Sequence, residues 1–346
     1  MRIGRYDEAV SVWTEAEARW PDDVDLKAQH ALALDSAGRV DERQFQGKPP
    51  LRARRHYRLL GLAFDALEQW PDAAEAFVRA QSVTGGELPD LPSLDEATSA
   101  ELQRLAEEPD FAETRGSAPV FLCGLPGSGV GQIAALLADQ PGWFVRRERF
   151  EAAPDFINAP FDPRLNQPLG QADLALLARR YRRPLQRAGV AETIRVVDWI
   201  PVLDARVVPA IKRTLPGARL VVVQREPHDM LLDWLGFGWS EGFSMPDPLT
   251  GARWLRLAGA HLAQAAAILP SFLVDPDALL AAGDSDMRMR LGLFLGVADL
   301  QTGPMTRGVR KGRGGLPVSF PPGHSSHYRE VFSEAFATLD DHASAG

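Results

Sequence analysis

Apolar residues recur at helical spacing through residues 4–86 of the chain. Segments 24–42 (VDLKAQHALALDSAGRVDE) and 51–69 (LRARRHYRLLGLAFDALEQ) place them at positions i, i+3 and i+4, which predicts two amphipathic helices. Segments 4–23 and 69–86 share a second pattern, in which an aromatic residue is followed by alanine, a second aromatic residue and another alanine. Small residues let neighbouring helices approach closely, so this region is expected to be all-α.

The pattern changes after residues 84–117, a stretch rich in Gly, Pro, Ser and acidic residues that contains one more predicted helix near residues 94–107. Beyond it, apolar runs with the length of buried strands alternate with helical segments. Strands are expected in residues 118–124 and 219–224, and helices in residues 129–140 and from Pro227 onward. This alternation predicts a parallel sheet with helices on both faces. The chain is therefore expected to comprise an all-α domain with its linker at residues 1–110 and an α/β domain at residues 111–346.

The first domain resembles the tetratricopeptide repeat, a helix-turn-helix unit of about 34 residues. The residues that match it best belong to one unit: Tyr57, Leu60, Gly61, Phe64, Ala73, Phe77 and Ala80. A middle unit is weaker, because Gly38 fits the pattern but QFQGKPP at residues 44–50 interrupts the second helix. The resemblance implies helical hairpins stacked into a short superhelix, whose acidic concave face would bind a peptide or protein partner.

Charge is divided unevenly along the 346-residue chain, whose formal net charge is −8. Residues 1–110 carry 13 Lys and Arg against 22 Asp and Glu, whereas residues 111–346 carry 25 against 24. The acidic part disfavours a nucleic-acid partner, because contacts to phosphate require clustered cations. No apolar run reaches the roughly 18 residues that span a bilayer. We therefore expect no membrane association and, in the absence of a leader-like segment, a cytoplasmic location.

The segment GLPGSGVG at residues 124–131 carries the strongest indication of chemistry. A buried strand, a glycine-rich turn and a helix together present backbone N–H groups and a helix N-terminus to a phosphate group. Gly124 and Gly129 have the spacing of a Walker A loop, but Val130 and Gly131 stand where that loop has Lys and Ser or Thr. The phosphate-neutralising cation and the magnesium-binding hydroxyl are thus missing, which makes a P-loop kinase a remote alternative. A tight turn without a ligand is another alternative.

The order of motifs further along resembles that of the sulfotransferases, above all the bacterial type fused to tetratricopeptide repeats. The family's first loop, PIFIVGLPRSGTT followed by a helix and HP, corresponds to PVFLCGLPGSGVG at residues 119–131 and to Gln140-Pro141. Later motifs match in the same order: VVDWIP (196–201), LPGARLVVVQREPHD (215–229) and Arg310-Lys311-Gly312. The resemblance covers roughly residues 118–336. It implies transfer of sulfate from 3′-phosphoadenosine 5′-phosphosulfate to a hydroxyl group of a peptide or a small molecule.

The resemblance assigns donor binding to the glycine loop and to polar groups further along the chain. The residues that it implies are Gly124, Pro126, Gly127, Ser128, Gly129, Val130, Gly131, Arg225, Asp233, Arg310, Lys311 and Gly312. Five positions depart from the family: Gly127 and Trp199 replace cations, Val130 and Gly131 replace two hydroxyl residues, and Asp233 replaces a serine that helps to hold the 3′-phosphate. A carboxylate near that phosphate would cost about 1–4 kcal/mol, depending on the local dielectric. These departures favour impaired transfer, or an inactive relative that serves as a repeat-based interaction module.

Two retained groups have more than one interpretation. Arg225 either grips the 3′-phosphate through a forked contact or forms a structural ion pair with Glu226 or Asp229. Glu148 stands where the family has the general base that takes the proton of the acceptor hydroxyl, and the neighbouring arginines would keep it ionised. The histidines at positions 228, 324 and 327 are alternatives to it, and an exposed charged turn is the alternative role of Glu148 itself.

The remaining reactive residue types predict little chemistry. No spacing of His, Cys, Asp or Glu indicates a metal site, and the resemblance implies no metal cofactor. Cys123 is the only cysteine, so an intrachain disulfide is excluded, and its apolar surroundings predict a buried, unreactive thiol.

Overall fold

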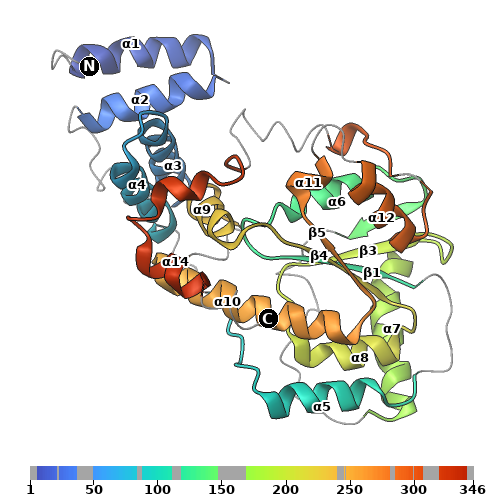
Figure 1. The fold of residues 1–346 in the computed structure, drawn as a ribbon. Coiled ribbons are helices and arrows are strands. Elements are labelled where there is room, and N and C mark those ends of the chain that lie inside the picture. Colours follow the sequence, from blue (N-terminus) through green and yellow to red (C-terminus); the bar gives the residue numbers. More distant parts are fainter. Residues whose placement is uncertain are drawn as a thin grey trace. The chain divides into compact units, whose positions relative to one another are not determined.

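The computed structural model describes residues 6–21, 23–36, 50–83, 88–110, 118–146, 169–239, 245, 247–280, 285–298, 300–306 and 319–340. By their contacts the residues group into two units, whose elements are labelled in Figure 1. We call Met1–Pro89, Glu226–Trp254 and Arg310–Gly346 the helical unit. Asp90–Arg225 and Leu255–Val309 form the sheet unit.

The first helices of the helical unit each pack against the next helix in the chain. They are α1 (Tyr6–Arg19), α2 (Val24–Ser36), α3 (Pro50–Ala66) and α4 (Trp70–Ser82). Small residues bring α3 and α4 close together, since a Cβ placed on Gly61 would lie only 2.4 Å from the ring of Phe77. Tyr57, Leu60 and Ala80 are buried in the same cluster. The predicted helices in residues 24–42 and 51–69 are confirmed as far as the described residues extend.

Later segments of the chain complete the helical unit. They are α9 (Pro227–Phe237), the first turns of α10 (Pro248–Ile268), the 3-10 helix η5 (His324–Tyr328) and α14 (Ser333–Asp340). Two buried carboxylates of α9 hold the chain around η5. Asp233 accepts a hydrogen bond from the N–H group of Phe320 (2.7 Å), and Asp229 accepts bonds from those of Gly323 (2.6 Å) and Ser325 (3.0 Å). The polar side chains of α9 therefore anchor backbone that is distant in sequence.

The sheet unit is built on five parallel strands in the order β2-β3-β1-β4-β5. They are β1 (Val120–Gly124), β2 (Trp143–Arg146), β3 (Arg195–Ile200), β4 (Arg219–Val223) and β5 (Ser271–Val274). The strand β1 is central, with Leu122 beside Trp199 of β3 and Val221 of β4. Every residue of β1 is buried, which explains why it is a continuous apolar run rather than an alternating one. The predicted combination of helices with a parallel sheet is confirmed.

Helices cover both faces of this sheet (Figure 1). One face packs on α6 (Val130–Ala138), α11 (Pro276–Leu280) and α12 (Ser285–Leu295). The other face is covered by α7 (Gln171–Arg187) and α8 (Val208–Thr214), and α5 (Glu96–Ala106) packs on α8. Val120 and Leu122 belong to the first layer, whereas Phe121 between them contacts Tyr181 of α7, with ring centroids 6.3 Å apart. Crossovers between parallel strands are right-handed, so the direction of a crossover decides which face its helix covers. The chain leaves β1 towards one edge of the sheet and then returns in the opposite direction, which places helices on both faces.

The apolar pattern predicted some of these elements and missed others. The helix α5 lies within residues 94–107, β1 within 118–124, α6 within 129–140 and β4 within 219–224, as expected. The strands β2 and β5 have only 4 residues each, and Asp198 interrupts the 6-residue β3, so none of them has a continuous apolar run as long as those of β1 and β4. The two units do not divide the chain at residue 110, because the helical unit also contains Glu226–Trp254 and Arg310–Gly346. The predicted boundary at residue 110 concerns segments that fold independently, and it stays a prediction.

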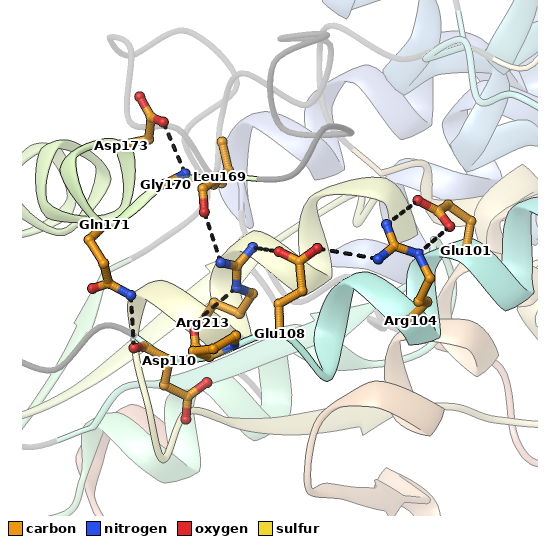
Figure 2. Close-up of polar contacts among 10 residues, drawn as sticks. Glu101, Arg104, Glu108, Asp110, Leu169, Gly170, Gln171, Asp173 and Arg213 are labelled. Atoms are coloured by element: carbon orange, nitrogen blue, oxygen red, sulfur yellow. Dashed lines mark hydrogen bonds and ion pairs between the residues drawn. The ribbon is translucent and has the colours of Figure 1, made fainter.

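A buried arginine ties together three parts of the sheet unit that are distant in sequence (Figure 2). Arg213 at the end of α8 is 4% exposed. It pairs with Glu108 (2.7 Å) and donates to the backbone carbonyls of Pro109 (3.3 Å) and Leu169 (2.8 Å). Glu108 also contacts Arg104 of α5 (3.4 Å). The guanidinium therefore fixes the end of α5 and the approach to α7 against α8.

Candidate functional site

The glycine loop follows the central strand directly and leads into α6. The N–H group of Ser128 donates to the carbonyl of Leu125 (3.0 Å), which closes the turn. Gly127 and Gly129 have φ angles of +77° and +75°, the left-handed region that glycine adopts without strain. The helix α6 begins at Val130; the N–H group of Gln132 donates to the carbonyl of Gly129 (2.9 Å), whereas those of Val130 and Gly131 have no acceptor within the helix. The local sequence thus produces the strand, loop and helix N-terminus that the pattern predicted at residues 121–131.

Gly124 and Ser128 fix the inside of this loop. A Cβ on Gly124 would lie 2.6 Å from the Oγ atom of Ser128 and 2.6 Å from the Cβ atom of Val130, so only glycine fits. Ser128 is 0% exposed, and its hydroxyl has no hydrogen-bond partner in the part of the chain that the structure describes. A buried hydroxyl without a partner costs about 1–3 kcal/mol in a folded protein. The loop therefore holds a polar group that a bound ligand would satisfy.

The loop lies at the edge of the sheet where ligands bind in open α/β folds. It follows the carboxyl end of β1, and the chain then crosses first to β2 and β3 on one side and later to β4 and β5 on the other. Such a reversal of strand order leaves a crevice outside the carboxyl ends of the central strands. The position of the loop, the N–H groups of Val130 and Gly131 at the start of α6 and the dipole of that helix all favour an anionic group.

Arg225 brings a cation to the same edge. It comes two residues after β4, whose last residue, Val223, lies beside Gly124 in the sheet. Its side chain is 2% exposed, and its Nε atom donates to Asp277 of α11 (2.6 Å). A longer contact of 3.5 Å joins its Nη1 atom to the carbonyl of Gly127. Sequence proximity had suggested Glu226 or Asp229 as the partner in an ion pair, whereas the structure shows Asp277, 52 residues further on.

The turn between β5 and α11 also touches the loop. A Cβ on Gly129 would lie 3.0 Å from Pro276, and the neighbouring Asp277 holds Arg225. Asp275 caps this turn, because its carboxylate accepts the N–H group of Asp277 (2.9 Å). Sequence reasoning missed Pro276 and Asp277 entirely. A short helix that begins with DPD gives no hint that it meets a loop 150 residues earlier.

Trp199, which the resemblance predicted in place of a lysine, lies in β3 and brings no charge to the loop. Its ring packs against the apolar layer of α6 and α12, and it lies 3.8 Å from where a Cβ of Gly131 would be. The indole N–H group has no partner among the described residues. Beside it, Asp198 of β3 forms a buried ion pair with Arg146, whose guanidinium lies over the ring of Tyr181. The carboxylate of Asp198 is therefore neutralised by Arg146 of the edge strand β2.

The other predicted donor residues fall into three groups. Asp233 belongs to the helical unit, where its carboxylate accepts the N–H group of Phe320. Pro126 and Val130 are in the loop and the first turn of α6, both buried. Four predicted residues lie outside the described residues: Glu148, Arg310, Lys311 and Gly312.

The histidines considered as bases are engaged inside the helical unit. His228 lies between the carboxylates of Glu226 (2.8 Å) and Asp340 (3.1 Å). His324 contacts Asp65 (2.8 Å), which also accepts the hydroxyl of Tyr328. Burial and this carboxylate raise the pKa of Tyr328 well above its usual range. His327 stacks on Trp70, with ring centroids 4.6 Å apart. These contacts fasten the segment around η5 to α3 and α4.

Other features add little to the candidate site. Cys123 is buried in β1, and burial raises the pKa of its thiol, so the sulfur stays protonated and unreactive. A cavity of about 70 Å³ lies at the opposite, amino ends of the strands, lined by Pro119, Leu185 and Leu215 among others. Within the described ranges no group of three or more His, Cys, Asp or Glu could hold a metal ion, and no helix is long and apolar enough to cross a membrane.

Comparisons with known proteins leave the identification to the site itself. No protein-family model matches the chain, and no curated protein shows significant sequence similarity to it.

Proposed function

We propose that this chain is a sulfotransferase-like protein whose glycine loop binds 3′-phosphoadenosine 5′-phosphosulfate weakly and whose transfer of sulfate is impaired. One observation carries the proposal. The loop at residues 124–131 joins the central parallel strand to a helix N-terminus, encloses the unpaired hydroxyl of Ser128 and has the buried Arg225 beside it. A phosphate or sulfate ester satisfies that hydroxyl and the N–H groups of the first turn.

The donor would supply an activated sulfuryl group at this loop. In the transfer, the acceptor oxygen forms a bond to sulfur, the bond between sulfur and the phosphate oxygen breaks, and adenosine 3′,5′-bisphosphate leaves. The chain must hold the phosphate end and remove the proton of the acceptor hydroxyl, for which Glu148 is the proposed base. Gly127 contributes no charge to the sulfuryl group, and a missing donor or cation of this kind lowers rates by roughly 10²–10³. Slow transfer follows from that absence.

The test is calorimetric titration with adenosine 3′,5′-bisphosphate, the spent donor. We expect measurable binding to the wild type and at least fivefold weaker binding to Ser128→Ala. The matched control is Thr214→Val in α8, because Thr214 is also 0% exposed and its hydroxyl also lacks a partner among the described residues. It should bind the ligand as the wild type does. Absence of binding by the folded wild type contradicts the proposal.

A second function is favoured by the packing of the helical unit. The contact between Gly61 and Phe77, with Tyr57, Ala73 and Ala80 buried around it, is what a tetratricopeptide hairpin requires. In this alternative the sheet unit is catalytically inactive and the repeats bind a peptide or protein partner. A chain that binds no adenosine bisphosphate but captures a defined peptide through residues 6–83 would favour it. A P-loop kinase remains remote, because the loop contains neither the lysine nor the hydroxyl that such enzymes use for phosphate and magnesium.

A further inference from the structure

We propose that Asp277 is a built-in competitor for the anion at the glycine loop. Its carboxylate occupies the guanidinium of Arg225, so a phosphate or sulfate ester must displace it to gain that cation. The inference rests on the proposed function for the identity of the ligand, but the competition itself concerns only the loop, Arg225 and Asp277.

The geometry places the carboxylate where a ligand oxygen would be expected. Arg225 donates to Asp277 from Nε at 2.6 Å, and its Nη1 atom reaches the carbonyl of Gly127 at 3.5 Å. The guanidinium is thus at the rim of the loop and buried, where a charge-assisted bond is strong. Asp277 is the more exposed partner, at 30% against 2% for Arg225. The aspartate can therefore turn to solvent when another anion takes its place, whereas the arginine stays.

The loop itself offers the remaining contacts. The hydroxyl of Ser128 is wholly buried and has no partner in the described part of the chain. It lies beside Gly124, between the strand and the first turn of α6, where the N–H groups of Val130 and Gly131 have no acceptor within the helix. These groups do not depend on Asp277. An anion would accordingly bind the wild type through these groups and through Arg225 once it has displaced Asp277, and it would bind more tightly when Asp277 is neutralised.

The turn that carries Asp277 is held against the loop by a second contact. Pro276 lies next to Gly129, and Asp275 caps the backbone at Asp277. The carboxylate is therefore positioned by the turn and does not reach Arg225 by chance from a flexible loop. Neutralising Asp277 should leave this turn in place, because neither the Pro276 contact nor the Asp275 cap depends on its charge.

The experiment compares Asp277→Asn with the wild type by titration with adenosine 3′,5′-bisphosphate and, separately, with pyrophosphate. Asp286→Asn is the matched control, since it makes the same charge change at an exposed ion pair on α12. We expect Asp277→Asn to bind both probes at least fivefold more tightly than the wild type, and Asp286→Asn to stay within twofold. Asp277→Glu keeps the charge and should behave as the wild type. Asp277→Ser replaces the asparagine variant if that variant does not fold.

The outcomes separate this inference from the proposed function. Equal affinities in Asp277→Asn and Asp286→Asn, or an equal gain in Asp277→Glu, overturn the competition and leave the function standing. If pyrophosphate responds to Asp277→Asn but adenosine bisphosphate binds no variant, the competition is supported and the sulfotransferase assignment fails. Binding of neither probe by any folded variant overturns both.

Discussion

Two buried arginines of the sheet unit each pair with a carboxylate, but their surroundings differ. Arg213 donates to two backbone carbonyls besides pairing with Glu108, and it joins three segments that are distant in sequence (Figure 2). Arg225 pairs with a partly exposed aspartate at the rim of a glycine loop and reaches a backbone carbonyl, that of Gly127, only at 3.5 Å. The hydroxyl of Ser128 in that loop has no partner among the described residues. Backbone carbonyls cannot be exchanged for a ligand, whereas a side chain on a turn can. The first arginine is therefore structural, whereas the proposal requires the second to exchange its carboxylate for a ligand.

The largest effect should come from removing the structural arginine. Arg213→Met leaves two carbonyls and Glu108 without their buried donor, and breaking a buried pair in this way costs about 3 kcal/mol of unfolding free energy. Urea unfolding followed by circular dichroism measures it. Arg104→Met is the control, because Arg104 is largely exposed and its ion pairs are screened by solvent, so its midpoint should hardly move. Similar losses in both variants would contradict the distinction.

The glycine loop should tolerate no side chain at its first position. Gly124→Ala places a methyl group 2.6 Å from Ser128 and Val130, and overpacking of this kind costs about 1–3 kcal/mol. Gly259→Ala in α10 has the opposite expectation, because nothing lies within 4 Å of its Cβ position and alanine favours a helix by about 0.5–1 kcal/mol. Thermal unfolding of the two variants gives the sign. A stabilising Gly124→Ala would mean that the loop is not as tightly built as described.

Removing the binding arginine should cost less stability than removing the structural one. In Arg225→Met the orphaned Asp277 is already partly exposed and can be hydrated, so we expect a loss of about 1–2 kcal/mol. Binding of adenosine bisphosphate should also weaken beyond detection, while Arg213→Met should retain it under conditions where that variant is folded. The measurements are the same unfolding curve and the same titration. If Arg225→Met proves the more destabilising variant, the comparison between the two arginines is reversed.

Two unpaired hydroxyls extend the comparison to neutral groups. Ser128→Ala and Thr214→Val each remove a buried hydroxyl without a partner in the described residues, so each should gain about 1 kcal/mol of stability. Only the first should lose ligand affinity, because only Ser128 lies in the loop. If Ser128→Ala gains stability but loses ligand affinity, its hydroxyl is a functional group. If Ser128→Ala destabilises the apo protein, its hydroxyl has a structural role instead.

The smallest effect concerns Asp139, whose carboxylate accepts hydrogen bonds from backbone N–H groups, just as Arg213 donates to backbone carbonyls. Burial alone would raise the pKa of Asp139, but hydrogen bonds from Thr306, Met305 and Gly303 outweigh it and lower the pKa. Because the folded pKa is depressed, the stabilisation is complete above the ordinary value of 3.8 and is lost as pH falls through the folded value. The difference in stability between the wild type and Asp139→Asn should therefore shrink below about pH 4. A constant difference down to pH 2 would contradict this.

Local sequence was informative where a segment decides its own structure. The apolar run into GLPGSG predicted a buried strand, a turn and a helix, because the strand is buried on both faces and the glycines adopt φ angles that other residues avoid. The helices of residues 24–36 and 50–66 followed from their periodicity. The strands β2, β3 and β5 were missed because their apolar runs are shorter than those of β1 and β4, and in β3 the run is interrupted by Asp198.

The sequence alone predicted a parallel sheet with a glycine loop, and it shows that residues 124–131 contain no Lys or Arg. The groups that surround the loop became visible only in the folded chain. Arg225 is followed directly by Glu226, yet it pairs with Asp277, 52 residues away, because β4 and β5 are neighbours and bring both chain ends to one edge of the sheet. Adjacent residues on a strand or turn point in different directions, whereas parallel strands align their carboxyl ends. The partners in an ion pair at such an edge depend on which strands are neighbours, and the local sequence of a strand does not show which strands lie beside it.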